Sequence, residues 1–369
     1  MGVHRPHWPS RLPAGFLGPE LYPNGTVLPP KHPLGIPGAP YMSGAYRDGD
    51  YRNPALGCPN CDAPTADTVE YRRWYYAAVT YADFMLGKAL ALLDELGETS
   101  KTIVVFHADH GEGAPPALSL SLSLSLWRWR SPCPMLALSP PLSLGLSLTR
   151  TNLMHTLAGY QLGELNEWSK KTNTELAVRV PLIVRVPWKA ASMGQRTSAR
   201  AELVDLFRTL VDLATLNSSD IPPDVQGVSL APLFDNPSVV PPALLKSAFS
   251  QIGSCACKNY TQTLPSGEIW TGLECNKGRC AAVPTRDFDF MGYTQISPEG
   301  WRYVLWAQMD RNTSRVDFSQ PTFEELYDLR ADGHQNFDFD AYSLNVAPQN
   351  PALCSTFKAA TISAVKSWY

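Results

Sequence analysis

An acidic residue and a histidine stand side by side near the predicted end of a buried strand. Residues 102–106 are all β-branched or aromatic, which predicts a short buried strand. Asp109 and His110 follow shortly after it. In open parallel α/β sheets, ligands bind outside the carboxyl ends of the strands. Asp109 and His110 are therefore candidate metal ligands, although the same pair is also typical of a polar turn.

Predicted helices and strands alternate around this candidate site. Apolar residues recur at helical spacing over residues 69–96, and Gly97 provides a common end for a helix. Residues 181–186 predict a further strand, and residues 202–213 predict an amphipathic helix. This alternation predicts an α/β domain in which helices pack against a sheet.

The pattern changes in the second half of the chain, which predicts a second structural unit. Short segments of strand character follow one another there, with few helical patterns between them. They lie at residues 248–252, 290–296, 301–307 and 325–329. We therefore expect a main domain over residues 1–220 and a smaller α+β subdomain over residues 225–369.

One internal segment has a composition unlike the rest of the chain. Residues 114–159 contain no Asp, Glu or Lys, while 13 Leu and 8 Ser dominate. A strict Leu-Ser repeat predicts a strand, but the Trp-Arg and Pro-rich parts that follow interrupt any continuous element. A long structureless loop inside a compact domain argues against native design. We therefore expect residues 112–159 to be a low-complexity insertion, such as a retained intron, that is absent from the native protein.

The composition excludes some classes of function. With 44% hydrophobic residues the chain can form a sizeable core. The net charge is −3 and the basic residues are scattered, whereas a nucleic-acid-binding domain shows a basic face. We therefore expect no nucleic-acid partner. We also expect no membrane span, because no apolar run has the required length. The first residues lack the apolar core of a signal peptide.

The cysteines and glycosylation sequons suggest a secretory or lumenal environment. Cys58 and Cys61 have a spacing that also occurs in zinc and redox sites, but a disulfide or inert thiols fit their loop context better. Four further cysteines cluster and suit disulfide bonds, namely Cys255, Cys257, Cys275 and Cys280. Candidate N-glycosylation sites occur at Asn24, Asn217, Asn259 and Asn312.

Four separate stretches form a pattern that is more specific than any one of them. They are His-Arg-Pro-His-Trp-Pro at 4–9 with Leu-Tyr-Pro at 21–23; residues 72–83 with Leu-Gly-Lys at 86–88; Ala-Asp-His-Gly at 108–111 with residues 162–170 and 179–184; and residues 325–332 with Asn336. In order and spacing, apart from the insertion, the chain resembles the sulfatases of the alkaline-phosphatase superfamily, and within them the iduronate-2-sulfatase type.

The resemblance implies a fold and a chemistry. The fold would be α/β, with an alkaline-phosphatase/sulfatase-like mixed sheet sandwiched by helices and a smaller C-terminal α+β subdomain. The activity would remove sulfate from a sulfated carbohydrate, of the iduronate-2-sulfate kind, or from a small sulfate ester. The cofactors would be one Ca²⁺ and a formylglycine made from Cys or Ser. The location of the full-length protein would be the lysosome, the endomembrane lumen or the extracellular space.

The resemblance also assigns roles to individual residues. Asp109 and His110 match two metal ligands, of which the carboxylate suits a hard cation better than the imidazole does. Lys170 matches an ammonium group that binds sulfate or a carboxylate. His7 matches a contact to the sulfate or leaving group, and it can donate a proton to the sugar oxygen. A divalent ion and a lysine together would stabilise the charge that develops on the sulfuryl oxygens.

The family's nucleophile, which lies in a Cys/Ser-x-Pro/Ala-x-Arg motif, is not assigned to a residue of this chain. The surroundings of Cys58 and Cys133 do not fit the motif, and in residues 7–11 a histidine stands where the Cys or Ser should be. We therefore expect the nucleophile and the first strand to lie upstream of Met1. We also expect this chain alone to be catalytically incomplete, because catalytic groups that act as a unit fail together.

Two other functions remain open on the sequence alone. The chain has only seven histidines, and they form no second metal cluster with Asp109. This disfavours a phosphatase, phosphodiesterase or phosphonate hydrolase of the same superfamily, which would use two metals. A non-catalytic pseudo-sulfatase that binds sulfated glycans would keep Lys170 and His7 without turnover.

Overall fold

A computed structural model describes most of the chain. The described residues are 12–30, 65–108, 151–157, 161–170, 172–217, 219, 221–255, 257–263, 269–274, 284, 287–330 and 344–368. The helices are α1 (Gly18–Leu21), α2 (Thr65–Glu95), α4 (Glu175–Val178), α5 (Asp205–Leu213) and α6 (Pro351–Ser367). Short 3-10 helices span Glu164–Asn166, Ala190–Ser192, Ala231–Phe234, Pro242–Leu244 and Ala347–Gln349.

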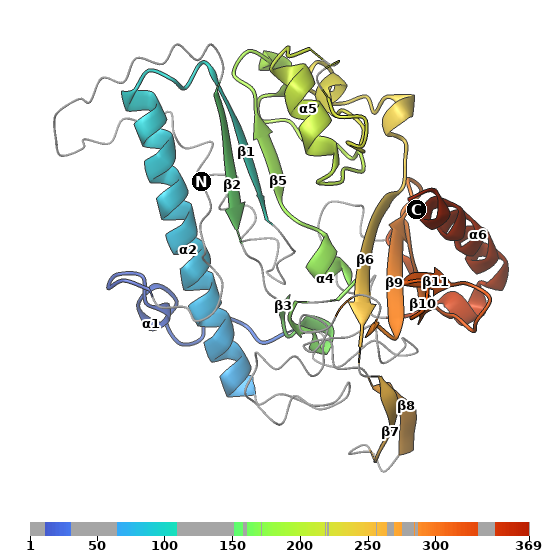
Figure 1. The fold of residues 1–369 in the computed structure, drawn as a ribbon. Helices are drawn as coiled ribbons and strands as arrows, with labels where there is room; N and C mark the ends of the chain where they lie inside the picture. The colour runs from blue at the N-terminus through green and yellow to red at the C-terminus, as the bar shows by residue number, and fades with distance from the viewer. Residues whose placement is uncertain are drawn as a thin grey trace.

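The first sheet is mixed and has helices on both faces (Figure 1). Its strands are β2 (Thr151–Leu157), β1 (Thr102–Ala108) and β5 (Leu182–Arg185), in that order. Because side chains alternate along a strand, Val104 and Phe106 of β1 pack against α2, whereas Ile103 and Val105 pack towards α5. The expected mixed sheet between helices is therefore confirmed.

The strand directions differ from a wholly parallel arrangement. β1 runs parallel to β2 but antiparallel to β5, with Val105 opposite Val184. Helix–strand alternation in the sequence is typical of a parallel sheet, so the reversal of β5 is information that only the structure provides.

Strand β2 lies inside the segment that we expected to lack regular structure. Residues 151–157 pair with β1 along its whole length, which differs from the expectation of no continuous element there. The remainder of residues 112–159 lies outside the described residues. Absence of this segment from the native protein stays a prediction.

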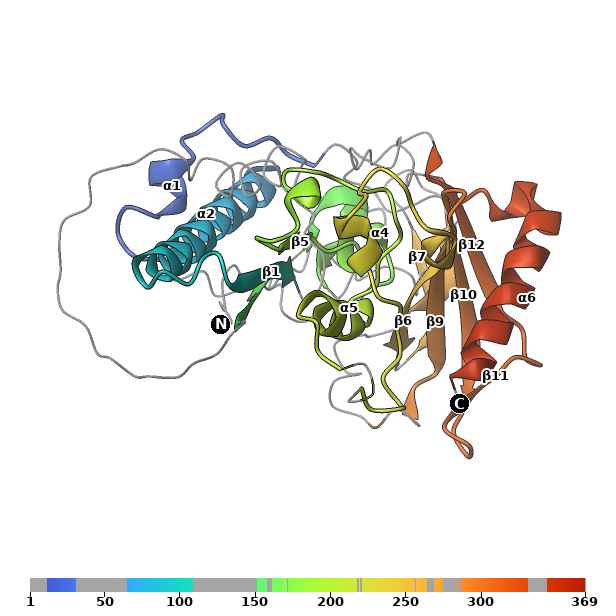
Figure 2. The same cartoon turned by 90° about the horizontal axis from the view of Figure 1, so that it is seen from above.

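The second sheet forms the C-terminal part of the molecule. Its strands are β6 (Ala248–Ser254), β9 (Phe290–Ile296), β10 (Trp301–Asp310), β11 (Arg315–Asp317) and β12 (Phe323–Asp328). Neighbouring strands in this sheet are antiparallel. Helix α6 covers one face of this sheet (Figure 2), where Phe357 and Cys354 pack with Tyr303 and Leu305.

Besides the short strand β11, two features of this part do not follow from the sequence reasoning. One is α6, which begins with Pro351 at its first turn and buries Cys354, Phe357, Thr361 and Val365 at spacings of three and four residues. The other is a separate hairpin of β7 (Lys258–Thr263) and β8 (Ile269–Glu274). A further short hairpin, β3 (Gln161–Leu162) with β4 (Trp168–Ser169), belongs to the candidate site.

Helix α2 meets the length and composition criteria for a membrane-spanning helix. Its buried side chains, including Tyr75, Tyr76, Val79 and Leu86, belong to the core cluster that also contains Phe106 of β1. The core helix of a globular protein meets the same criteria, so this is weak evidence for a membrane, and the expectation of no membrane span stays a prediction.

Candidate functional site

Four residues were predicted to take part in metal and sulfate chemistry. Lys170 is the one among them that the structure describes. It is half-buried and directly follows β4. His7, Asp109 and His110 lie outside the described residues. Asp109 is the next residue after Ala108, the last residue of β1, which is fully buried. The structure thus describes the strand before the candidate metal ligands, and the segment around Lys170.

A tight hairpin precedes Lys170. Gln161 lies opposite Ser169, and Leu162 lies opposite Trp168. The loop between them has two residues with left-handed backbone, Gly163 (φ 94°) and Leu165 (φ 55°). Glycine adopts such a φ without strain, but a buried leucine does so only where its surroundings hold it. The backbone before Lys170 is therefore tightly constrained.

A buried ion pair attaches this hairpin to α2. Nη1 of Arg72 lies 3.3 Å from Oε1 of Glu164, and both side chains are 4% exposed. The Arg72 guanidinium also donates to the carbonyl of Leu162 and to the hydroxyl of Tyr76. Burial raises the pKa of Tyr76, and the adjacent Arg72 only partly opposes that rise. Glu164 is thus fixed by a cation that comes from a different element.

Side chains on one side of the segment after Lys170 bind back to the hairpin. Nε2 of Gln161 donates to Oγ1 of Thr172 (2.9 Å) and to Oγ1 of Thr174 (2.8 Å). The two threonine hydroxyls are 2.8 Å apart and share a hydrogen bond. All three residues are buried, and Oε1 of Gln161 has no hydrogen-bond partner within the described part of the chain.

The residue between the two threonines binds in the opposite direction, to the C-terminal sheet. Nδ2 of Asn173 donates to the carbonyl of Gly292 in β9 at 2.7 Å. The carbonyl of Asn173 accepts hydrogen bonds from Arg302 of β10 and from Thr294 of β9. In Figure 1 the segment from β3 to α4 accordingly lies between α2 and β6. Residues 172–174 therefore connect the two parts of the molecule.

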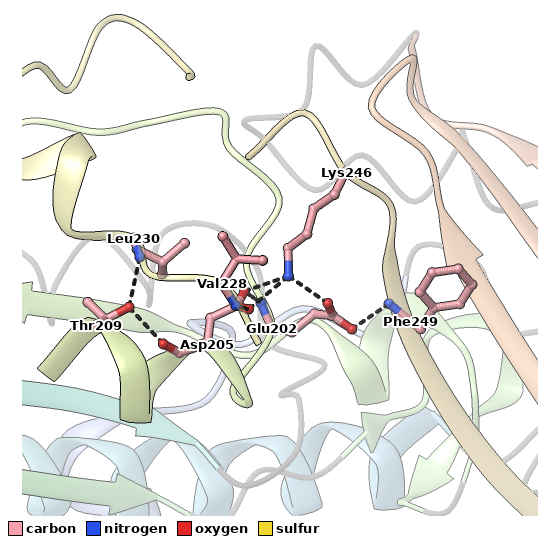
Figure 3. Close-up of polar contacts among 7 residues, drawn as sticks. All are labelled: Glu202, Asp205, Thr209, Val228, Leu230, Lys246 and Phe249. Carbon is pink, nitrogen blue, oxygen red and sulfur yellow. Dashed lines mark hydrogen bonds and ion pairs between the residues drawn. The ribbon is translucent and has the colours of Figure 1, made fainter. Parts of the chain in front are cut away.

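A second polar cluster joins the two parts at α5 (Figure 3). The Lys246 ammonium lies 2.8 Å from Oδ1 of the fully buried Asp205 and 2.8 Å from Oε2 of Glu202. Asp205 also accepts from the backbone N–H of Val228, and Glu202 accepts from that of Phe249 in β6. Burial acts to lower the pKa of Lys246, but the hydrogen bonds to Asp205 and Glu202 outweigh it and raise the pKa.

The metal site of the sequence analysis is not tested by the described residues. Among them, no group of three or more His, Cys, Asp or Glu residues is placed to hold a metal ion. The two candidate ligands, Asp109 and His110, lie outside that part of the chain. Calcium binding therefore stays a prediction, and we derive no chemical step through the ion.

The structure places some of the other candidate residues. Cys255 and Cys257 are each disulfide-bonded, whereas Cys58, Cys61, Cys275 and Cys280 lie outside the described residues. Asn24, Asn217 and Asn312 are exposed, as glycosylation requires. The side chain of Asn259 is outside the described set.

Sequence reasoning missed several residues of this region. Gln161, Asn173 and Arg302 have no local pattern that marks them, because their partners are 11 to 129 residues away. Arg72 lies in the stretch of residues 72–83, but its ion pair with Glu164, 92 residues further on, has no local signal. One further stretch of the sequence carries a signal for the nucleophile. Residues 43–47, Ser-Gly-Ala-Tyr-Arg, fit the nucleophile pattern literally. They lie outside the described residues and follow the stretch at residues 4–9, whereas the family pattern places the nucleophile before that stretch.

The structure thus combines a mixed sheet between helices with a polar segment, residues 161–174, that is hydrogen-bonded to α2 and to the C-terminal sheet. Residues 3–216, more than half of the chain, match the family model described as Sulfatase. The chain belongs to the sulfatase family.

Curated relatives and solved structures agree with this assignment. Iduronate 2-sulfatase from Mus musculus is 27% identical over 383 residues, with coverage of 91% of this chain and 56% of the relative. Iduronate 2-sulfatase from Homo sapiens is 28% identical over 252 residues, with coverage of 60% and 36%. A phosphonate monoester hydrolase from Silicibacter pomeroyi superposes with a TM-score of 0.59 at 19% identity, over 99% of this chain and 55% of that one. The last likeness supports the fold alone.

The chain spans only part of its relatives. It covers 56% of the length of the mouse protein and 36% of the human one. Activity, substrate and partners of a whole sulfatase are therefore proposals for this chain.

Proposed function

We propose that this chain is part of a sulfuric ester hydrolase that removes sulfate from a sulfated carbohydrate of the iduronate-2-sulfate kind. The observation that carries the proposal is the sulfatase family match over residues 3–216, which includes the constrained segment around Lys170. The two relatives named iduronate 2-sulfatase support the finer substrate class. A lysosomal or secreted location of the full-length protein belongs to the same proposal.

In this proposal Lys170 binds the anionic part of the substrate. Lys170 is half-buried as a residue, and an ammonium group attracts a sulfate or carboxylate oxygen more strongly wherever water is partly excluded. The hydrogen bonds around residues 161–174 hold its backbone before the ligand arrives, which lowers the entropic cost of binding. His7 would donate a proton to the leaving sugar oxygen.

The proposal also includes a divalent cation and a modified nucleophile residue. Asp109 and His110 would hold one Ca²⁺, which would supply positive charge at the sulfate oxygens. The nucleophile would be a formylglycine made from a Cys or Ser, and it is not assigned to a described residue. Glycan binding without turnover is the alternative that the sequence leaves open, and the experiment below distinguishes it from sulfate hydrolysis.

Ligand binding and sulfate release by the 369-residue chain test this proposal. We expect a heparin-type disaccharide with 2-sulfated iduronate to bind in the presence of Ca²⁺. Lys170→Ala should weaken binding by about 10-fold or more, because a hydrogen bond to a charged group contributes about 1.5–3 kcal/mol. Lys101→Ala is the control, because Lys101 is exposed and pairs with Glu98. Titration calorimetry measures the affinities, and ion chromatography measures free sulfate.

The possible outcomes distinguish sulfate hydrolysis, glycan binding without turnover, and a chain that lacks part of the catalytic machinery. Binding without sulfate release, lost in Lys170→Ala, supports the assigned anion site. If a chain that includes the upstream nucleophile motif also binds without release, the non-catalytic reading is favoured. Release of sulfate by the 369-residue chain would show that these residues are sufficient for catalysis. Loss of that release in Ser43→Ala would place the nucleophile within residues 43–47. Equal affinity of wild type and Lys170→Ala would contradict the role of Lys170.

A further inference from the structure

Asn173 is bound by three strands of the C-terminal sheet. Its amide donates to Gly292 of β9 at 2.7 Å, and its Oδ1 accepts from the hydroxyl of Ser250 in β6 at 3.4 Å. Its carbonyl accepts from the Arg302 guanidinium of β10 and, at 3.3 Å, from the Thr294 hydroxyl of β9. Asn173 is 2% exposed, so these hydrogen bonds take the place of water.

The side chains of residues 172–174 bind alternately to the hairpin and to the C-terminal sheet. Consecutive side chains of residues 172–174 bind on opposite sides of the segment. Thr172 and Thr174 bind Gln161 on the side of the hairpin, while Asn173 binds the C-terminal sheet on the other side. Residues 172–174, which begin two positions after Lys170, are thus held from both sides.

The sheet side of this arrangement is itself rigid. The Arg302 guanidinium stacks over the ring of Tyr327, 4.9 Å from its centroid. The Tyr327 hydroxyl donates to Glu325 at 2.5 Å, and Nε1 of Trp306 donates to the same carboxylate at 2.7 Å. All four side chains are buried. These contacts attach Arg302 to buried side chains of the sheet, while its Nε has no hydrogen-bond partner among the described residues.

We propose that Asn173 is a positioning residue through which the C-terminal sheet fixes the backbone at Lys170 and thereby sets the affinity of the site for a sulfated ligand. The proposal rests on the anion-binding role proposed above for Lys170. It gives the C-terminal sheet a part in ligand binding, although none of the candidate site residues lies in that sheet.

The experiment measures Lys170 in two ways, one of which needs no ligand. Acetylation of Lys170 by a water-soluble succinimidyl ester is followed by mass spectrometry, and the affinity for the sulfated disaccharide is measured by calorimetry. We expect Asn173→Ala to raise the acetylation rate of Lys170 by about 5-fold, through local opening of the segment. We expect the affinity to fall by about 10-fold, as the loss of a buried hydrogen bond predicts.

A matched control separates positioning from stability. Asn345 is also a buried asparagine of the C-terminal part, and its side chain bonds the backbone of Leu326, Ala347 and Glu324. Asn345→Ala should lower the melting temperature as Asn173→Ala does, yet leave Lys170 acetylation and ligand affinity as in the wild type. Measurements are made well below both melting temperatures.

A milder pair guards against a variant that does not fold. Thr294→Val keeps the shape of the side chain but removes its hydrogen bond to Asn173, whereas Thr294→Ser keeps the hydroxyl. The valine variant should shift acetylation in the direction of Asn173→Ala, and the serine variant should restore the wild-type rate.

Each result has a defined meaning. If Asn173→Ala and Thr294→Val change Lys170 acetylation no more than Asn345→Ala does, the positioning role is wrong. If the wild type binds no sulfated ligand, the proposed function fails, and the acetylation rates still decide whether Asn173 positions Lys170. A change in acetylation without a change in a measurable affinity would overturn the link from Asn173 to ligand binding.

Discussion

At the residue scale, the backbone at Gly227 shows how close contacts restrict the choice of side chain. Gly227 has φ +92°, and a Cβ atom there would lie 2.4 Å from the carbonyl oxygen of Val204 at the start of α5. Gly227→Ala should therefore lower the free energy of unfolding by at least about 2 kcal/mol, since an L-residue with left-handed backbone alone costs about 1–2 kcal/mol. Urea unfolding followed by circular dichroism measures the change.

Gly87 provides the matched control. It is exposed within α2, and an added Cβ would meet no atom within 4 Å. Gly87→Ala should stabilise the protein by about 0.5–1 kcal/mol, because alanine loses less conformational entropy in a helix. Equal effects of the two substitutions would contradict the steric argument.

At the element scale, the Lys246 cluster holds α5 to the chain that enters β6. Lys246→Met would leave the carboxylate of Asp205, which is fully buried, without its cation. Removal of one partner from such a pair costs about 3 kcal/mol. In contrast, Lys189→Met should cost less than about 1 kcal/mol, because Lys189 pairs with the exposed Asp235. Denaturant unfolding at neutral pH measures both differences.

The difference in unfolding free energy between wild type and Lys246→Met should depend on pH with a defined sign. Folding raises the pKa of Lys246 above its ordinary value of 10.5. The stabilisation is therefore fully present below pH 10.5, and it is lost as the pH rises through the higher pKa of the folded state. The stability difference between wild type and Lys246→Met should stay constant from neutral pH to about pH 10 and then shrink. A difference that grows at alkaline pH would show that another group is responsible.

At the scale of the whole molecule, the segment 112–159 leads to the most consequential prediction. We expect the native protein to lack it, so that Asp109, His110 and Gly111 continue directly into residue 160. A proteomic digest of the natural source should then contain peptides from residues 161–217 but none from 112–159. Detection of a peptide from the inserted segment would show that the prediction is wrong.

A deletion variant tests the same prediction physically. A chain without residues 112–159 should fold and melt at a temperature at least as high as the full chain, because an insertion that is foreign to the native fold contributes only the entropy of a longer loop. The described strand β2 gives the opposite expectation, since its loss would expose an edge of β1. Aggregation of the deletion variant would therefore favour β2 as a native strand.

Local patterns predicted many of the elements correctly. The helix expected over residues 69–96 is α2 (Thr65–Glu95), and the strand expected over 290–296 is β9 with the same bounds. These elements carry strong periodic or β-branched patterns, which depend only on neighbours in the sequence. The helix α6 was missed because two of its buried positions are a cysteine and a threonine, which weaken the apolar pattern.

The sequence by itself determined the sulfatase family, the mixed α/β class and the identity of Lys170 as a candidate ligand of the substrate. Only the tertiary structure decided that β5 runs antiparallel to β1 and that Asn173 meets Arg302, 129 residues further along the chain. Family motifs and periodicity are short-range features that side-chain types encode directly. Strand direction and long-range hydrogen bonds depend instead on how the whole chain buries its apolar surface while satisfying its buried polar groups.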